Sequence, residues 1–191
     1  MKHLALATGI LALAAPLALA QTSTWKIDPA HSEVDFACVH MSVSHVHGRI
    51  GGLNGNITLN EADITKSSVS VTIDTTTTDT GVSMRDNDLK SANFLDVTTY
   101  PTATFASTSV AKGGSGLTIT GNLTLHGVTK PVTLDVEGPS GPNPGMDHKP
   151  HSGYTATTTI KRTDFGIAPK FPSAAVSDDI KLTIELEVVK Q

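Results

Sequence analysis

HSEVDFACVH, residues 31–40, places its side chains alternately on two faces. One face carries apolar residues and ends in a histidine (Val34, Phe36, Cys38 and His40). A period of two is typical of a β-strand, in which successive side chains point to opposite sides of the sheet. We therefore expect a strand with one buried face. On that face His40 needs a partner, because an unpaired buried polar group costs about 1–3 kcal/mol.

Similar runs rich in Thr, Val and Ile recur along the chain with turn residues between them, as strands require. The other predicted strands cover residues 49–59, 67–75, 102–110, 117–125, 132–136, 154–162 and 180–188. We expect a short helix over residues 82–90 with Met84 and Leu89 turned inward, a second helical turn at 93–96, and a Pro/Gly-rich loop over 138–153. The pattern predicts an all-β fold of about eight antiparallel strands with a short helical insertion.

Glycines inside residues 49–59 permit a sharp bend and so favour a closed barrel over a sandwich. The interior of an eight-stranded barrel is just wide enough to be filled by side chains or to hold one small ligand. Aromatic residues make up only 4% of the chain, so the lining is expected to be small and aliphatic. Such a lining suits a flexible aliphatic ligand, and a filled core without a cavity is the alternative.

Residues 1–20, MKHLALATGILALAAPLALA, have the layout of a secretory signal peptide, with a polar start, an apolar stretch and an Ala-Leu-Ala cleavage site. We expect cleavage after Ala20, one domain over residues 21–191, and a location in the periplasm or outside the cell. No later apolar run approaches the roughly 18 residues of a transmembrane helix. Cys38 is the single cysteine, so it cannot form an internal disulfide and is expected to act as a small hydrophobe.

The formal net charge of −4 does not favour binding to nucleic acid. The sequence has neither a phosphate-binding glycine loop nor the Gly-x-Ser-x-Gly turn of serine hydrolases. His31 and Ser32 are neighbours, so a strand would point them to opposite faces. These observations predict that the protein is not an enzyme, and catalysis on a lipid carried in the barrel is the alternative.

Several motifs follow one another along the domain. They are Trp25-x-Ile27-Asp28-x-x-His31-Ser32-x-Val34-x-Phe36, Arg85-Asp86-x-x-Leu89-x-Ser91-x-x-Phe94, Tyr100-Pro101, Gly121-Asn122-Leu123-Thr124-Leu125-His126-Gly127-Val128-Thr129-Lys130-Pro131 and Arg162-x-Asp164-Phe165-Gly166. Together they resemble the YceI family of lipid- or polyisoprenoid-binding domains over essentially all of residues 21–191. The resemblance implies an extended eight-stranded antiparallel barrel similar to the lipocalins. It also implies a long tunnel for an isoprenoid chain or another amphiphile, no cofactor apart from this bound lipid, and no established catalytic reaction.

The ligand's chain is expected to lie along the inward faces of the strands, where apolar burial contributes roughly 25 cal/mol per Å². The expected tunnel lining is Val34, Phe36, Cys38, Val69, Val71, Ile73, Phe105, Leu123, Leu125, Ile160, Leu182 and Ile184. The expected polar end consists of His40, Arg49, Asp86 and Arg162. Two interpretations of that end stay open. One is contact with a quinone, phenol or phosphate head group, and the other is a buried network in which Asp86 pairs with Arg162. For Arg49 a surface ion pair is a further alternative.

A periplasmic metal-binding protein is the alternative function. His45 and His47 lie two residues apart, so a strand places both imidazoles on one face. Zinc or copper would need further ligands, for which the candidates are His31, His40, His148 and His151. Solvated loop histidines are the simpler interpretation. The outer faces of a barrel also leave a homodimer open.

Overall fold

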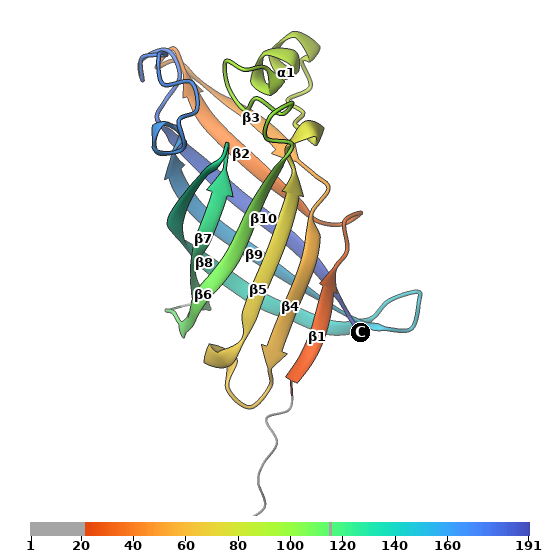
Figure 1. The fold of residues 1–191 in the computed structure, drawn as a ribbon. Coiled ribbons are helices and arrows are strands. Elements are labelled where there is room, and N and C mark those ends of the chain that lie inside the picture. Colours follow the sequence, from red (N-terminus) through yellow and green to blue (C-terminus); the bar gives the residue numbers. More distant parts are fainter. Residues whose placement is uncertain (1–21, 115) are drawn as a thin grey trace, which may run out of the picture.

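The computed structural model describes residues 22–114 and 116–191, which form a tilted β-barrel with a short helix over one end (Figure 1). The predicted signal peptide, residues 1–20, lies outside the described residues. The strands are β1 (Thr22–Ile27), β2 (Glu33–His40), β3 (Ser44–Ile50), β4 (Asn54–Asn60), β5 (Ser68–Asp74), β6 (Thr102–Lys112), β7 (Leu117–Leu125), β8 (Val128–Pro144), β9 (Pro150–Lys161) and β10 (Asp179–Lys190). The helix is α1 (Ser83–Lys90), and the 3-10 segments are η1 (Ile64–Lys66), η2 (Thr75–Thr77) and η3 (Arg162–Phe165).

These strands occupy eight positions around a closed wall. The hydrogen-bonded order is β1-β4-β5-β6-β7-β8-β9-β10, and the pairing of β10 with β1 closes the ring. β2 and β3 extend the wall toward the end that carries α1 (Figure 1). All pairs are antiparallel, which confirms the predicted all-β, eight-stranded antiparallel barrel with a short helical insertion.

The barrel closes at β10, and one edge of this strand pairs with two different strands. Its first edge pairs with β9 along nearly its whole length. On the second edge, residues 181–185 pair with β2 and residues 188–190 pair with β1. Between them the backbone of Glu187 bonds to the connection from β1 to β2: the Asp28 N–H donates to the Glu187 carbonyl at 2.9 Å, and the Glu187 N–H donates to Ser32 Oγ at 3.0 Å. Closure leaves no open edge at this seam.

The predicted strand 49–59 is interrupted by residues 51–53 and becomes β3 and β4. Gly52 has a φ of 66°, which glycine adopts without strain, and a Cβ there would lie 2.8 Å from the Cβ of Asp74. The interruption lets the chain leave β2, the partner of β3, and continue as β4 beside β1. The predicted single bent strand is therefore two strands.

The predicted Pro/Gly loop 138–153 is largely strand, since β8 continues to Pro144 and β9 begins at Pro150. Backbone pairing continues there with two register shifts, and Ser140 lies opposite Gly153 and Asn143 opposite His151. Most of the β8 extension is exposed on both faces, so its side chains show no apolar period. The strand prediction failed here because it depended on that period.

The helix α1 agrees with the predicted short helix, but two details differ. Residues 92–95 form turns, and Asp96 has a left-handed φ of 44°, so the second helical turn at 93–96 is absent. The Met84 side chain is 84% exposed, and it does not point inward as predicted, whereas Leu89 packs against the core. Among the described residues, no helix is long and apolar enough to cross a membrane.

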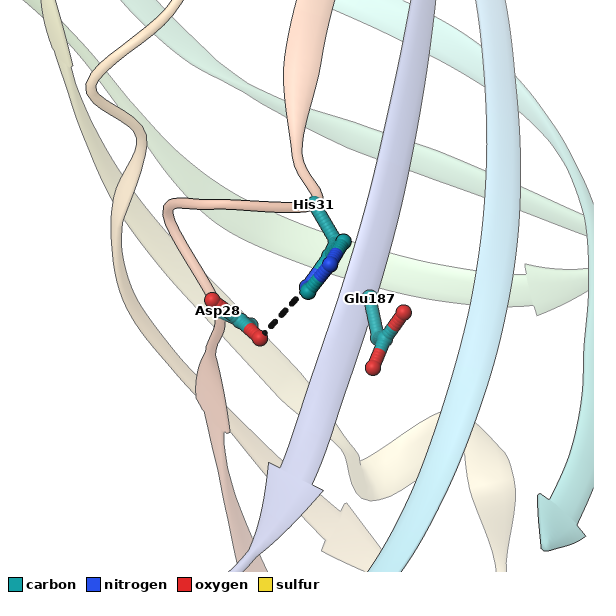
Figure 2. Close-up of side chains that lie close together, drawn as sticks. All are labelled: Asp28, His31 and Glu187. Carbon is teal, nitrogen blue, oxygen red and sulfur yellow. Dashed lines mark hydrogen bonds and ion pairs between the residues drawn. The ribbon is translucent and has the colours of Figure 1, made fainter. Parts of the chain in front are cut away.

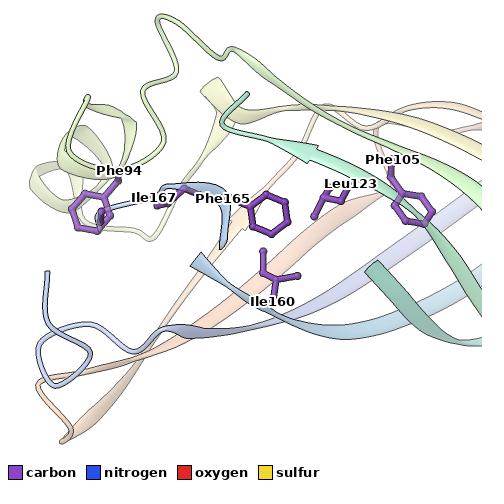
Figure 3. Packing of buried hydrophobic residues seen from close by; sticks show 7 residues of the cluster. Phe94, Phe105, Leu123, Ile160, Phe165 and Ile167 are labelled. Atoms are coloured by element: carbon purple, nitrogen blue, oxygen red, sulfur yellow. The ribbon is translucent and has the colours of Figure 1, made fainter. Parts of the chain in front are cut away.

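Two buried apolar clusters lie inside the barrel. The cluster near α1 contains Phe94, Phe105, Leu123, Ile160, Phe165, Ile167 and Ala168. Figure 3 shows Phe165 beside Leu123 and Ile160, with Phe94 and Ile167 at the end nearest α1. The other cluster contains Trp25, Ile27, Val34, Leu53, Val71 and Val188. Side chains from the segment after α1 and from η3 therefore cover the helical end of the interior.

Leu53→Ala should lower the free energy of unfolding by about 2–5 kcal/mol, because Leu53 is fully buried and its loss leaves a cavity. Denaturant unfolding followed by circular dichroism measures this change. The matched control is Val43→Ala, whose side chain is 85% exposed and whose effect should stay within about 0.5 kcal/mol. Equal effects of the two substitutions would contradict the placement of Leu53 in the core.

Candidate functional site

Two apolar chambers lie end to end inside the barrel. The chamber remote from α1 has a volume of about 130 Å³, and the chamber below α1 has a volume of about 150 Å³. Val34, Ile73, Leu123 and Leu182 line both, so the chambers adjoin at these four side chains. Their lining is almost entirely apolar, which makes the interior a narrow path along the barrel axis.

Every residue predicted to line the tunnel faces one of these chambers. The chamber below α1 contacts Val34, Phe36, Cys38, Ile73, Leu123, Leu125, Ile160 and Leu182, and the other contacts Val34, Val69, Val71, Ile73, Phe105, Leu123, Leu182 and Ile184. The reason is the strand period: alternate positions on a closed wall all face inward.

The predicted tunnel lining left out several residues that line the chambers. Those on strands include Ile57, Leu59, Val132, Leu134, Val136, Tyr154, Ala156 and Leu186, and those outside strands include Leu53, Leu89, Phe94, Leu95, Ile167 and Val176. The strand residues follow the same period of two and could have been found from it. The residues from turns follow no period, and only the folded chain brings them to the chamber.

Burial keeps two ionisable side chains of the lining, Cys38 and Tyr154, neutral. Desolvation raises the pKa of the Cys38 thiol above its ordinary value of 9.0, and it raises the pKa of the Tyr154 hydroxyl above 10.0. Both groups therefore stay protonated at neutral pH. Cys38 contributes a small hydrophobic surface to the chamber below α1, as the sequence predicts.

Arg162 is the charged side chain that lines the chamber below α1, and it is 3% exposed. It does not pair with Asp86. Its guanidinium donates to the backbone carbonyls of Ile167 (3.1 Å), Ala168 (2.5 Å), Phe171 (2.7 Å), Val176 (3.1 Å) and Ser177 (3.2 Å). A guanidinium has five N–H donors, so every one of them has a partner within the chain.

This arrangement makes Arg162 a clamp on residues 167–177, the segment between η3 and β10. The carbonyls of a surface segment would otherwise bond to water, and here one buried cation gathers five of them. The interpretation of Arg162 as part of a buried network is supported, with backbone oxygens as partners. No N–H of the guanidinium is left for a ligand's head group.

The other three residues of the predicted polar end lie apart from Arg162. His40 is exposed at the end of β2, so the prediction of a buried histidine is wrong. Arg49 is 61% exposed and pairs with Glu33 at 3.7 Å and Asp79 at 3.5 Å, which is the surface ion pair named as an alternative. The end of β2 projects beyond the ring, and a period of two does not show where a strand leaves the core.

Asp86 anchors the start of the helical segment. Its carboxylate accepts the Thr80 N–H at 2.8 Å and the Thr80 hydroxyl at 2.5 Å. Arg85 donates to the Thr80 hydroxyl and carbonyl at 2.8 and 3.1 Å. The Thr80 hydroxyl is the main cause that holds the pKa of Asp86 below its ordinary value of 3.8. Asp86 therefore shapes the cap over the barrel end and does not reach Arg162.

The histidines that the sequence offers as metal ligands lie in different parts of the structure. His45 and His47 are exposed on β3, with ring centroids 6.4 Å apart. His148 is exposed in the turn between β8 and β9, whereas His151 on β9 contacts Glu187 and Asp147. Among residues 22–114 and 116–191, three metal-ligating side chains come together only at Asp28, His31 and Glu187 (Figure 2). The predicted pair His45 and His47 is not part of that group.

A closed antiparallel barrel with an apolar path through it and a capped end belongs to the architectural class of closed antiparallel β-barrels. The chain belongs to the YceI-like domain family, whose model matches residues 25–188. A protein of Salmonella newport named Protein YceI is 41% identical over 175 residues, which cover 90% of each chain.

Solved structures share the fold. The Campylobacter jejuni YceI protein superposes with a TM-score of 0.71 at 32% identity, and the match covers 80% of this chain and 90% of that one. A polyisoprenoid binding domain from Saccharophagus degradans has a TM-score of 0.61 at 16% identity, and the match covers 87% of this chain and 98% of that one. At 16% identity the second likeness concerns the fold alone.

Arg162→Leu should lower the free energy of unfolding by about 3–5 kcal/mol, because it removes the donor from two buried and three partly buried bonds to backbone carbonyls. Arg49→Leu is the matched control and should change it by no more than about 1 kcal/mol, since that arginine is exposed and its ion pairs are hydrated. Denaturant unfolding of both variants measures the difference. Similar small effects would show that the clamp contributes little.

The carboxyl group of Asp86 should titrate below its ordinary pKa of 3.8 in an NMR pH titration. Because the folded pKa is depressed, the stability from this group is present above the unfolded pKa and is lost as the pH falls through the folded value. Thr80→Val should raise the pKa of Asp86 toward 3.8, whereas Thr76→Val, which removes a hydroxyl bonded to Asp74, should leave it unchanged. An unmoved pKa in Thr80→Val would refute the assigned cause.

Proposed function

We propose that this protein is an exported lipid-binding protein that holds one polyisoprenoid chain, or a similar amphiphile, inside its barrel. The observation that carries the proposal is the pair of adjoining apolar chambers along the barrel axis. Cavities that remain in a protein core cost free energy, so a retained apolar path is best explained by an occupant. A flexible chain of isoprenoid units fits this narrow apolar path better than a planar aromatic molecule does.

The family and the fold support this proposal. The chain belongs to the YceI-like domains, and the Saccharophagus degradans domain that shares its fold is described as polyisoprenoid binding. Apolar burial supplies affinity at roughly 25 cal/mol per Å², before the cost of ordering the lipid. We propose that the chain of the lipid lies across the shared lining residues and that its head lies toward α1.

Arg162 gives the helical end a positive charge without an unused donor. A head group at that end would interact electrostatically with the positive charge of the guanidinium, but it would not replace the carbonyls that the guanidinium binds. We infer that shape and burial select the ligand more than hydrogen bonding does. A quinone or polyprenyl species fits this description.

We propose that the protein carries, stores or protects its ligand and catalyses no reaction. The inward residues are apolar, and their ionisable groups are held neutral or fully hydrogen-bonded. The signal-like residues 1–20 support a location in the periplasm or outside the cell. We propose this location together with the lipid ligand.

Ile73→Trp should abolish lipid occupancy, because Ile73 lines both chambers and the larger ring would fill the junction between them. The protein is purified without detergent, and its organic extract is quantified by mass spectrometry. Thr72→Trp is the matched control, since the neighbouring side chain is exposed on the outer face and its variant should keep the wild-type lipid content.

Overpacking at residue 73 should cost about 1–3 kcal/mol, so a melting curve must show that the variant is folded. A stoichiometric isoprenoid in the wild type that is lost only in Ile73→Trp supports the proposal. An empty extract from folded wild-type protein, or equal lipid content in both variants, contradicts it.

A further inference from the structure

A group of metal-ligating side chains lies on the outer wall of the barrel. Asp28, His31 and Glu187 each offer one ligand atom, and these atoms lie within 4.8 Å of one another. Figure 2 shows Asp28 and His31 on the connection between β1 and β2, with Glu187 facing them from β10. Glu187 faces outward because its neighbours Leu186 and Val188 pack inside the barrel.

The backbone around these residues is already held in place. The Asp28 N–H and Ser32 Oγ bond to the carbonyl and N–H of Glu187, so the two segments are joined directly behind the side chains. The Ala30 N–H donates to Asp28 Oδ1 at 2.9 Å, which turns Oδ2 toward His31. A site whose ligands are positioned before binding loses less entropy when an ion arrives.

His151 contacts Glu187, one of the three potential metal ligands, and holds its carboxylate in place. Its Nδ1 lies 2.6 Å from Glu187 Oε1, and its Nε2 lies 3.0 Å from Asp147 Oδ1. Both ring nitrogens are therefore engaged with carboxylates, and His151 acts as a positioning residue that orients Glu187. Hydrogen bonds of this kind to ligating carboxylates are a regular feature of metal sites.

The group opens on a hollow of about 920 Å³ between β10 and the β8–β9 hairpin. Asp28, His31, Glu187, His151 and Asp147 all line it. An ion bound by three side chains at its edge would keep at least one coordination position for water or another small ligand.

We propose that Asp28, His31 and Glu187 bind one divalent transition-metal ion of the zinc class. One imidazole and two carboxylates supply hard and borderline donors and two negative charges, and no thiolate is involved. Ligand atoms at 2.0–2.1 Å from a tetrahedral ion stand about 3.3 Å apart. The Nδ1–Oδ2 distance of 2.9 Å between His31 and Asp28 therefore needs only a small opening. The ion replaces the proton shared by this pair, which is released to solvent.

This site is independent of the proposed lipid function because it uses the outer face of β10, whereas the chambers use the inner face. It also differs from the predicted pair of His45 and His47, which lies on β3. The two histidines of that pair provide a control for unspecific binding by exposed imidazoles.

Isothermal titration of the chelator-treated protein with zinc chloride tests the proposal. The expected result is one zinc ion per chain, with affinity at least 100-fold weaker in His31→Ala and in Glu187→Gln. His151→Phe should weaken binding about 10–100-fold, because it removes the support of Glu187. The double variant His45→Ala, His47→Ala should bind zinc as the wild type does.

Circular dichroism melts confirm that each variant is folded, and His31 is a mild test because its side chain is 65% exposed. Loss of zinc binding only in the double variant overturns the proposal, as does wild-type affinity in both His31→Ala and Glu187→Gln. Absence of binding in the wild type also overturns it. Equal affinity for magnesium would reject the zinc class, since magnesium prefers oxygen ligands.

Discussion

The division of one edge of β10 between β1 and β2 is the constraint on which the rest of this structure depends. β1 is too short to pair with the whole of that edge. It covers residues 188–190 of β10, and β2 covers residues 181–185 nearer the helical end. The chain therefore crosses from β1 to β2 beside Glu187, and it crosses back from β3 to β4 at residues 51–53. These two crossings give an elongated barrel with eight wall positions.

A long barrel with few large side chains encloses more interior volume than those side chains can fill. The two apolar chambers are the result, and they meet at side chains from four different strands. The helical end is covered by segments without regular structure, and Arg162 holds one of them through five carbonyls. A buried cation is costly to desolvate, and this number of partners offsets that cost. The chambers and the Arg162 clamp together give a barrel with an apolar interior and a defined closed end.

The inner and outer faces of β10 serve different chemistry because strand side chains alternate. Leu182, Ile184 and Leu186 face the interior, where removal from water favours apolar side chains. Glu187 faces outward at the seam, where it meets Asp28 and His31. The closure thus brings polar groups from distant parts of the sequence together at the one place where the connection between β1 and β2 crosses β10.

The sequence by itself determined most of the strands, their inward faces and the class of fold, but not the break between β3 and β4 or the extension of β8 and β9. Residues such as Val34, Ile73 and Leu182 could be assigned because the period of two depends only on local backbone geometry. The family motifs added the eight-stranded closure. Only the tertiary structure decided that His40 lies beyond the barrel, that Asp86 bonds to Thr80, and that Arg162 holds backbone carbonyls. It alone brought Glu187 to His31. These outcomes depend on where strands end and how turns fold back, and contacts between residues far apart in sequence leave no local pattern to read.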